Sequence, residues 1–157
     1  MFSQQLKRYE INMQSVLLRN NDRIRFHEKL KHSPDFDLFI GIVSKSSTFV
    51  FQEYLVKYRK LENSLTSKNI SIWWSEMKYT IDKIFMDEEL LYKYSNSSKF
   101  IYAKIFYNKA RFLISKGNKR QARKELYPYK FLSIKYFFLY FTTFFPIFIW
   151  KFIHKYK

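Results

Sequence analysis

A charge-free run near the end of the chain limits what this sequence can fold into. The run, Tyr136–Trp150, is fifteen residues long, and eight of them are Phe or Tyr. It is shorter than the roughly twenty residues that an α-helix needs to cross a bilayer, and it contains Pro146. Lys135 and Lys151 bracket it. Cationic ends around an aromatic middle are typical of a segment that lies among lipid headgroups.

We therefore expect this segment to lie on, or re-enter, an anionic membrane surface. Two alternatives remain open: a true span over 131–153 with lysines that snorkel, and a buried core helix. The residues expected to contact the membrane are Lys135, Tyr136, Phe137, Tyr140, Trp150, Lys151 and Lys155.

The charge of the chain is concentrated in the same part. Residues 1–98 hold 15 basic and 12 acidic side chains, whereas residues 99–157 hold 14 basic side chains and one acidic. Such an excess favours a polyanionic partner, either a membrane surface or nucleic acid. The apolar run favours the membrane, and no nucleic-acid recognition motif is present, so nucleic acid is the less favoured partner.

Other composition features narrow the function further. There is no cysteine, and the three histidines do not form a metal-ligand set, so we expect no metal site. The N-terminus has no apolar run of signal-peptide length. These features predict a cytoplasmic protein that is peripheral or re-entrant at the inner face of the membrane.

Helical periodicity dominates from residue 70 onward. Apolar residues recur at three- and four-residue steps and predict a helix over 70–86, and the acidic start Asp87-Glu88-Glu89 predicts another helix over Leu90–Tyr94. Further helices are expected over 99–115 and 119–126. Gly117 is expected in the left-handed conformation after the first of these, and Asn118 as the cap of the second.

The first seventy residues have a different pattern. Ser33-Pro34-Asp35 is typical of a helix start, with Leu38, Ile42 and Val43 as the apolar face. Apolar runs predict strands over 11–18 and 49–57. The predicted class is therefore α+β, mostly α. By capping alone, Asp35 and Asp37 have a structural interpretation at the positive end of the helix dipole.

Three segments of this region, in order, resemble the latter part of the catalytic domain of family 2 glycosyltransferases of GT-A type. They are Pro34–Phe39, Leu55–Arg59 and Asn63–Thr66, and Ile11–Arg19 is similar to the family strand that precedes them. The resemblance implies that residues 1–69 are the C-terminal remnant of a GT-A α/β domain. A helical tail region would follow at 70–127, and a membrane-associating segment at 128–157.

The resemblance also implies an activity, the inverting transfer of a sugar from a nucleotide sugar to a cell-surface glycan or lipid-linked acceptor, as in polysaccharide biosynthesis. Asp35 would be the general base. Asp37, Tyr58 and Arg59 would support the acceptor side.

The chain departs from the family pattern at three places. Pro34 replaces the first acid of the usual pair, Leu61 replaces the usual His, and the nucleotide-binding half with its Asp-x-Asp motif does not precede residue 9. We therefore expect this fragment to bind no cofactor and to be inactive alone, because nucleotide sugar and Mg or Mn belong to an intact family member. The alternative is a non-catalytic, basic, membrane-associated adaptor, which could pair with a separately encoded nucleotide-binding half.

Overall fold

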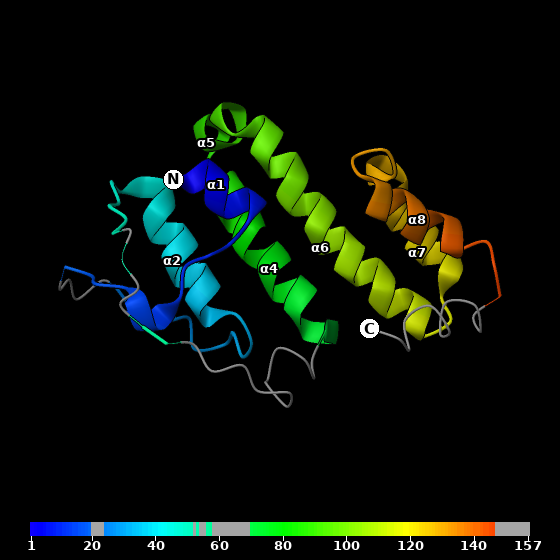
Figure 1. Ribbon diagram of the computed structural model, residues 1–157, viewed down its shortest axis with the longest axis horizontal. Helices are drawn as coiled ribbons and strands as arrows, with labels where there is room; N and C mark the ends of the chain where they lie inside the picture. The colour runs from blue at the N-terminus through cyan, green and yellow to red at the C-terminus, as the bar shows by residue number, and fades with distance from the viewer. Residues whose placement is uncertain (20–23, 52, 54–55, 58–69, 147–157) are drawn as a thin grey trace. The chain divides into compact units, whose positions relative to one another are not determined.

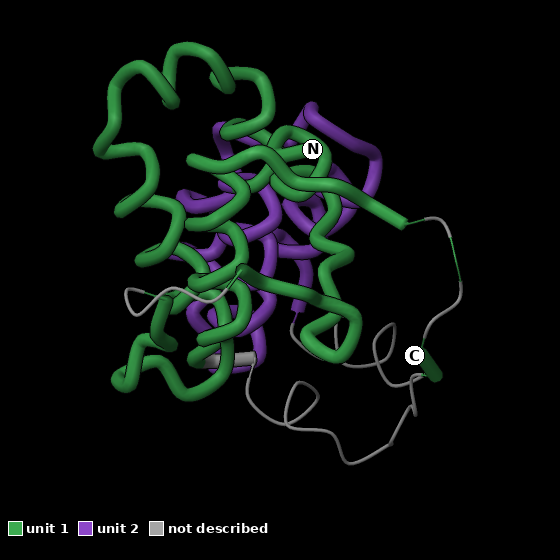
Figure 2. The backbone as a smooth tube through the Cα atoms, turned by 90° about the vertical axis from the view of Figure 1, so that its left-hand side faces the viewer, with its two compact units in different colours: residues 1–101 green, residues 102–157 purple. Residues whose placement is uncertain are grey.

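The computed structural model describes residues 1–19, 24–51, 53, 56–57 and 70–146, and every regular element in these ranges is helical. The chain divides into two compact units, Met1–Ile101 and Tyr102–Lys157 (Figure 2). Unit 1 contains the helices α1 (Phe2–Lys7), α2 (Pro34–Lys45), α4 (Ile70–Phe85) and α5 (Glu88–Lys93). Helix α6 (Ser95–Ser115) begins in unit 1 and ends in unit 2.

Helix α2 begins with Pro34 at its first position, as expected. It packs on α1 and α4 (Figure 1). Its buried apolar residues are Phe36, Phe39, Ile40 and Val43, spaced three and four apart. Of the predicted face, Val43 is confirmed as buried, whereas Leu38 and Ile42 are half-buried because the two phenylalanine rings take the buried side.

Helix α4 confirms the predicted helix over 70–86. Met77, Ile81 and Ile84 are buried along one side, as the periodicity requires. Aromatic rings pack together at the C-terminal end of α4. The centroid of the Phe2 ring lies 6.4 Å from that of Phe85 and 4.8 Å from that of Tyr94. Residues 70–101 lie in the same compact unit as the N-terminal helices.

The α+β prediction is wrong, because no strand occurs in the described residues. Over 11–18, Asn12 caps a 3-10 turn, Met13–Ser15, by accepting a hydrogen bond from the Gln14 backbone N–H at 3.2 Å. Leu17, placed in a buried strand by its apolar neighbours, is 93% exposed. An exposed apolar run beside a capped turn has no sheet to join, so the α/β remnant implied by the resemblance is corrected to a helical fold.

The second predicted strand, 49–57, is corrected in the same way as far as the structure describes it. Phe49, Val50 and Phe51 are exposed and form no ladder. The rings of Phe49 and Phe51 contact each other edge-on, with 5.0 Å between centroids. Positions 52, 54 and 55 of this prediction lie outside the described residues.

Unit 2 continues from α6 through α7 (Lys119–Leu126) and the 3-10 turn Tyr127–Tyr129 to α8 (Ile134–Thr142). The joint between α6 and α7 follows the expectation. Gly117 has φ 82°, and the Asn118 N–H donates to the Leu113 carbonyl at 2.8 Å, which closes a Schellman motif. The Asn118 side chain then caps α7 by accepting from the Gln121 N–H at 3.3 Å.

The core of unit 2 lies between α6, α7 and α8. It consists of Ala110, Ile114, Ala122, Leu126 and Leu139, with partly buried Tyr107, Leu113 and Tyr140 packed against it. The two alanines allow close approach of α6 and α7, and Leu139 brings α8 onto them. One side of α8 is thereby committed to the core.

Replacement of glycine by alanine should have opposite effects on stability at the two glycines of the chain, Gly41 and Gly117. No side-chain or backbone atom lies within 4 Å of a Cβ added at Gly41 or Gly117, so backbone conformation alone decides. Gly41→Ala, inside α2, should raise the free energy of unfolding by about 0.5–1 kcal/mol. Gly117→Ala should lower it by about 1–2 kcal/mol, because its φ is left-handed.

Native-state hydrogen exchange, read separately on amides of each unit, measures both changes. Equal effects of the two substitutions would contradict the conformations described here.

Candidate functional site

Asp35, the predicted general base, lies in the first turn of α2 and is half-buried. The Tyr9 ring packs edge-on against Phe36 at 5.0 Å, near this carboxylate. Burial, and then the negative charge of Asp35, raise the pKa of Tyr9. Neither of the two open grooves described below is lined by Asp35.

Asp37 has a structural position. Its buried Oδ1 accepts hydrogen bonds from Thr80 Oγ1 at 2.9 Å and from Lys83 Nζ at 2.6 Å. These contacts join α2 to α4 through a charge-assisted pair. Tyr58 and Arg59, the other predicted acceptor-side residues, lie outside the described residues.

Glu76 on α4 is the most extensively bonded carboxylate described in unit 1, and our sequence analysis missed it. It accepts hydrogen bonds from the backbone N–H groups of Lys31, His32 and Ser33 at 2.8–2.9 Å, and from Ser33 Oγ at 2.9 Å. The Ser33 hydroxyl, expected to cap α2, is thus used on Glu76. The sequence signal that could have identified Glu76 is an acidic residue next to Met77, within the apolar stripe of α4.

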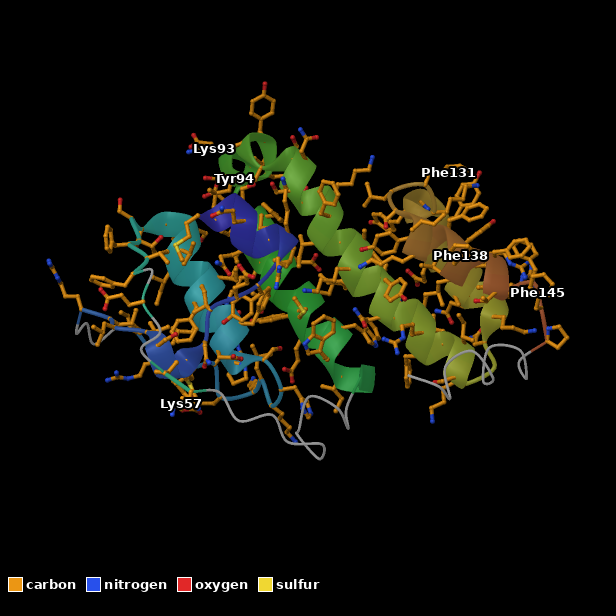
Figure 3. The ribbon with its side chains drawn as sticks, in the orientation of Figure 1. Lys57, Lys93, Tyr94, Phe131, Phe138 and Phe145 are labelled. Atoms are coloured by element: carbon orange, nitrogen blue, oxygen red, sulfur yellow. The ribbon has the colours of Figure 1, made fainter. Side chains whose placement is uncertain are left out.

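An exposed aromatic face is the main surface feature of unit 2. It consists of Phe131, Ile134, Phe137, Phe138, Phe141, Phe144 and Phe145, on and beside α8. Phe131 is 80% exposed and Phe138 59% (Figure 3). The rings form a continuous series, in which Phe137 stacks on Phe131 and Phe141 with 6.3 Å between centroids. The side of α8 opposite the core is therefore apolar as well.

Three cations, the rim cations Arg123, Lys130 and Lys135, lie against aromatic rings around this face. The Lys130 ammonium is 3.8 Å from the centroid of Tyr127 and 5.0 Å from that of Phe131. The Arg123 guanidinium is 3.8 Å from the Phe144 centroid. All of these distances are within the range of cation–π attraction.

Cations of α7 also bind the C-terminal end of α8. Arg123 donates to Thr143 Oγ1 at 3.1 Å and to the Thr143 carbonyl at 3.0 Å, and Lys119 donates to the Phe145 carbonyl at 2.8 Å. Positive charge at a helix C-terminus is favourable because carbonyl groups are left unpaired there. These bonds fix the orientation of α8.

The residues predicted to contact the membrane differ in their exposure to solvent. Lys135 and Phe137 are exposed, and Tyr140 is half-buried. Tyr136 points into the core of unit 2 and contacts the Tyr107 ring edge-on at 5.3 Å. Trp150, Lys151 and Lys155 lie outside the described residues. Of the exposed phenylalanines that we did not name, Phe138 and Phe141 lie on α8 at a three-residue step away from Leu139, and this spacing is the signal that could have found them.

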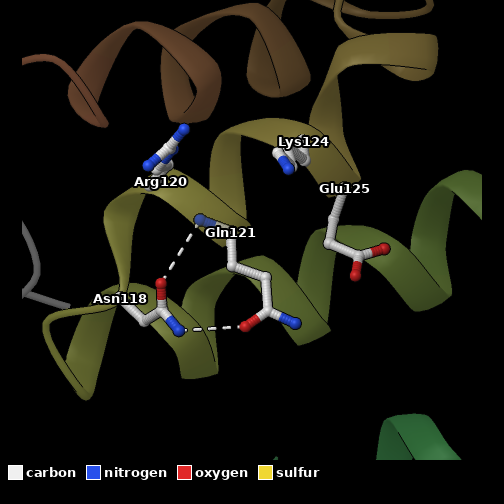
Figure 4. Close-up of a pocket in the computed structure, with 5 residues that line it drawn as sticks. All are labelled: Asn118, Arg120, Gln121, Lys124 and Glu125. Carbon is white, nitrogen blue, oxygen red and sulfur yellow. Dashed lines mark hydrogen bonds between the residues drawn. The ribbon is translucent and has the colours of Figure 1, made fainter.

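Two open grooves lie elsewhere on the described surface. One, of about 560 Å³, lies beside α7 and is lined by Asn118, Arg120, Gln121, Lys124 and Glu125 (Figure 4). Asn118 and Gln121 there bond to each other through the helix cap. The other, of about 490 Å³, is lined by Ser44, Lys45, Asp87, Glu89, Leu90 and Lys93. Both are shallow and polar, unlike the enclosed apolar pockets that bind small molecules.

In the ranges that the structure describes, no helix combines the length and apolar character required to cross a bilayer. The same ranges hold no group of three or more His, Asp or Glu side chains placed to bind a metal ion.

Comparisons with family models, curated proteins and solved structures found no match to this chain. The glycosyltransferase activity thus stays a prediction from the sequence resemblance alone. Its structural premise, an α/β remnant, is overturned by the helices of unit 1.

Glu76 predicts a measurable acid sensitivity. Burial alone would raise its pKa, but the hydrogen bonds from Lys31, His32 and Ser33 outweigh burial and lower the pKa from its ordinary value of 4.5. The stabilisation is therefore complete above pH 4.5 and is lost as the pH falls through the lowered folded-state pKa. Glu76→Gln should lower the free energy of unfolding by about 1.5–3 kcal/mol at neutral pH and less in acid.

Urea unfolding followed by circular dichroism at neutral and acid pH tests this, with the exposed Glu53→Gln as the charge-matched control. A Glu76→Gln variant that loses as little stability as the control would refute the role of Glu76.

Removal of the negative charge should destabilise the protein more at Asp37 than at Asp35, the two predicted site carboxylates. Asp37→Asn leaves Lys83 without its charged partner and should cost about 1–3 kcal/mol. Asp35→Asn removes only a favourable charge in the first turn of α2, which is worth about 0.3–1 kcal/mol. Urea midpoints of the two variants measure the difference, and a larger loss for Asp35→Asn would contradict the placement of Asp37.

Proposed function

We propose that this chain is a non-catalytic peripheral adaptor that docks on an anionic membrane surface through the aromatic face and the rim cations. The observation that carries the proposal is that α8 is apolar on two opposite sides, only one of which is used by the core. A solvent-facing helix side is normally polar in a protein that works alone in water.

The dimensions of α8 suit a helix that lies in the membrane plane. Its nine residues give a length of about 13 Å, well below the hydrocarbon thickness of about 30 Å. Lying flat, it can insert its outward rings to the depth of the acyl boundary while Leu139 stays in the core. The aromatic face then becomes the buried surface of the docked state.

Charge complementarity identifies the membrane as anionic. Residues 102–146 contain ten basic side chains and one acidic, Glu125. Glu125 is paired with Lys109 at 2.5 Å and so offers little repulsion to an approaching anionic lipid. Each cation near an anionic leaflet contributes about 1 kcal/mol, so even part of this set makes binding favourable.

The cation–π contacts connect these two contributions. Lys130 and Arg123 hold their charges against the outer rings. Insertion of the rings would therefore bring the charges to the headgroup phosphates, with the apolar stems of the side chains along the rings.

Removal of two outward rings should separate this proposal from simple charge attraction. Phe138→Gln/Phe141→Gln should weaken binding to phosphatidylserine vesicles by about tenfold or more, since burial of a Phe side chain is worth about 1.5–3 kcal/mol. The matched control is Phe49→Gln/Phe51→Gln, which removes two exposed rings from unit 1. Vesicle co-sedimentation at physiological salt measures the difference.

Equal weakening by both pairs would contradict the assignment of the surface. Tighter binding of wild-type protein to single-stranded nucleic acid than to anionic vesicles would replace the membrane with a nucleic-acid partner.

A further inference from the structure

Two lysines, Lys104 of α6 and Lys135 of α8, lie together at the edge of the aromatic face. The Lys135 ammonium is 5.5 Å from the ring centroid of Tyr107, which follows Lys104 by three residues on α6. Residues three apart share a helix side, so both lysines lie on the same side of α6. The contact between Tyr107 and Tyr136 holds α6 and α8 together at this point.

This pair has no anion to neutralise it within the described residues. Neither lysine forms an ion pair there, and the carboxylate of Glu125 is occupied by Lys109. Lys104 is half-buried, and burial together with repulsion from Lys135 lowers its pKa. Two neighbouring ammonium groups repel each other, and a bound anion would neutralise that repulsion.

The pair lies where lipid phosphates would be. Lys135 directly follows the exposed Ile134 and is therefore rotated by about 100° around α8 from the aromatic face. When that face is inserted in the membrane, a side chain in this direction is at headgroup depth.

We propose that Lys104 and Lys135 form a binding site for the phosphomonoester headgroup of a membrane lipid. This inference rests on the proposed membrane docking. A phosphomonoester carries a charge of about −1.5 to −2 at neutral pH, which matches two ammonium groups, whereas a phosphodiester carries a single charge. It also presents three terminal oxygens, enough to accept from both lysines at once.

The test compares vesicles that contain phosphatidic acid with vesicles that contain phosphatidylserine, adjusted to equal zeta potential. Wild-type protein should prefer phosphatidic acid by about tenfold, the value of one additional charge-assisted hydrogen bond. Lys104→Gln/Lys135→Gln should abolish this preference. The control Lys116→Gln/Lys124→Gln removes the same charge from exposed positions of unit 2 and should keep it. Lys135→Gln alone, an exposed change that leaves the fold intact, should lose part of it.

The outcomes separate the two proposals. Equal binding of wild-type protein to both vesicle types would overturn the phosphomonoester site and leave membrane docking in place. Binding to neither vesicle type would overturn the docking and the site with it. Loss of the preference in the control pair would also overturn the site.

A last arm distinguishes lipid from free phosphate. Inorganic phosphate is titrated into the wild-type protein without vesicles while the side-chain NMR signal of Lys104 is followed. If the signal saturates only at a concentration of inorganic phosphate much higher than the concentration of phosphatidic acid that saturates vesicle binding, the lipid is the ligand. Saturation at equal concentrations would assign the site to soluble phosphate.

Discussion

The structure of unit 2 depends on the hydrogen bonds that fix the end of α8. α8 has only nine residues, and Arg123 donates to the carbonyl of its C-cap residue, Thr143, while Lys119 donates to the carbonyl of Phe145, just beyond it. A helix of this length is marginal in water without tertiary support. Because its C-terminus is held by charge and Leu139 by the core, its outward side is not free to rotate inward. The phenylalanines stay on the surface for that reason, at the expense of solubility.

Much of the helical architecture could be predicted from the sequence, because local signals and packing agree there. The apolar spacing of α4, the left-handed Gly117 and the capping Asn118 are all local features. The charge-free run likewise overlaps α8, on which part of the exposed aromatic face lies. The direction of individual rings could not be predicted, since the 3.6-residue period permits any side of α8 to face the core. Packing against Tyr107 decides that Tyr136 is inside.

Unit 1 shows why the predicted strands were wrong. Leu17 belongs to an apolar run, yet its side chain is exposed. Asn12 caps a 3-10 turn within the same segment, so the segment is not an extended strand. Acidic residues at a helix start serve many folds, so a resemblance carried by them says little about chemistry. In this chain Asp37 bonds α2 to α4, and Glu76 bonds the residues just before α2 to α4. An acidic residue in the apolar stripe of α4 marks Glu76, but the local sequence does not identify the distant partners of either carboxylate.

Asn118 serves two helices at once, since its backbone closes α6 and its side chain opens α7. No residue separates the motif that ends α6 from the cap of α7, because Asn118 belongs to both. Insertion or deletion of a single amino acid at this joint would deprive one helix of its terminus, so length variation among related sequences should be accommodated at other loops.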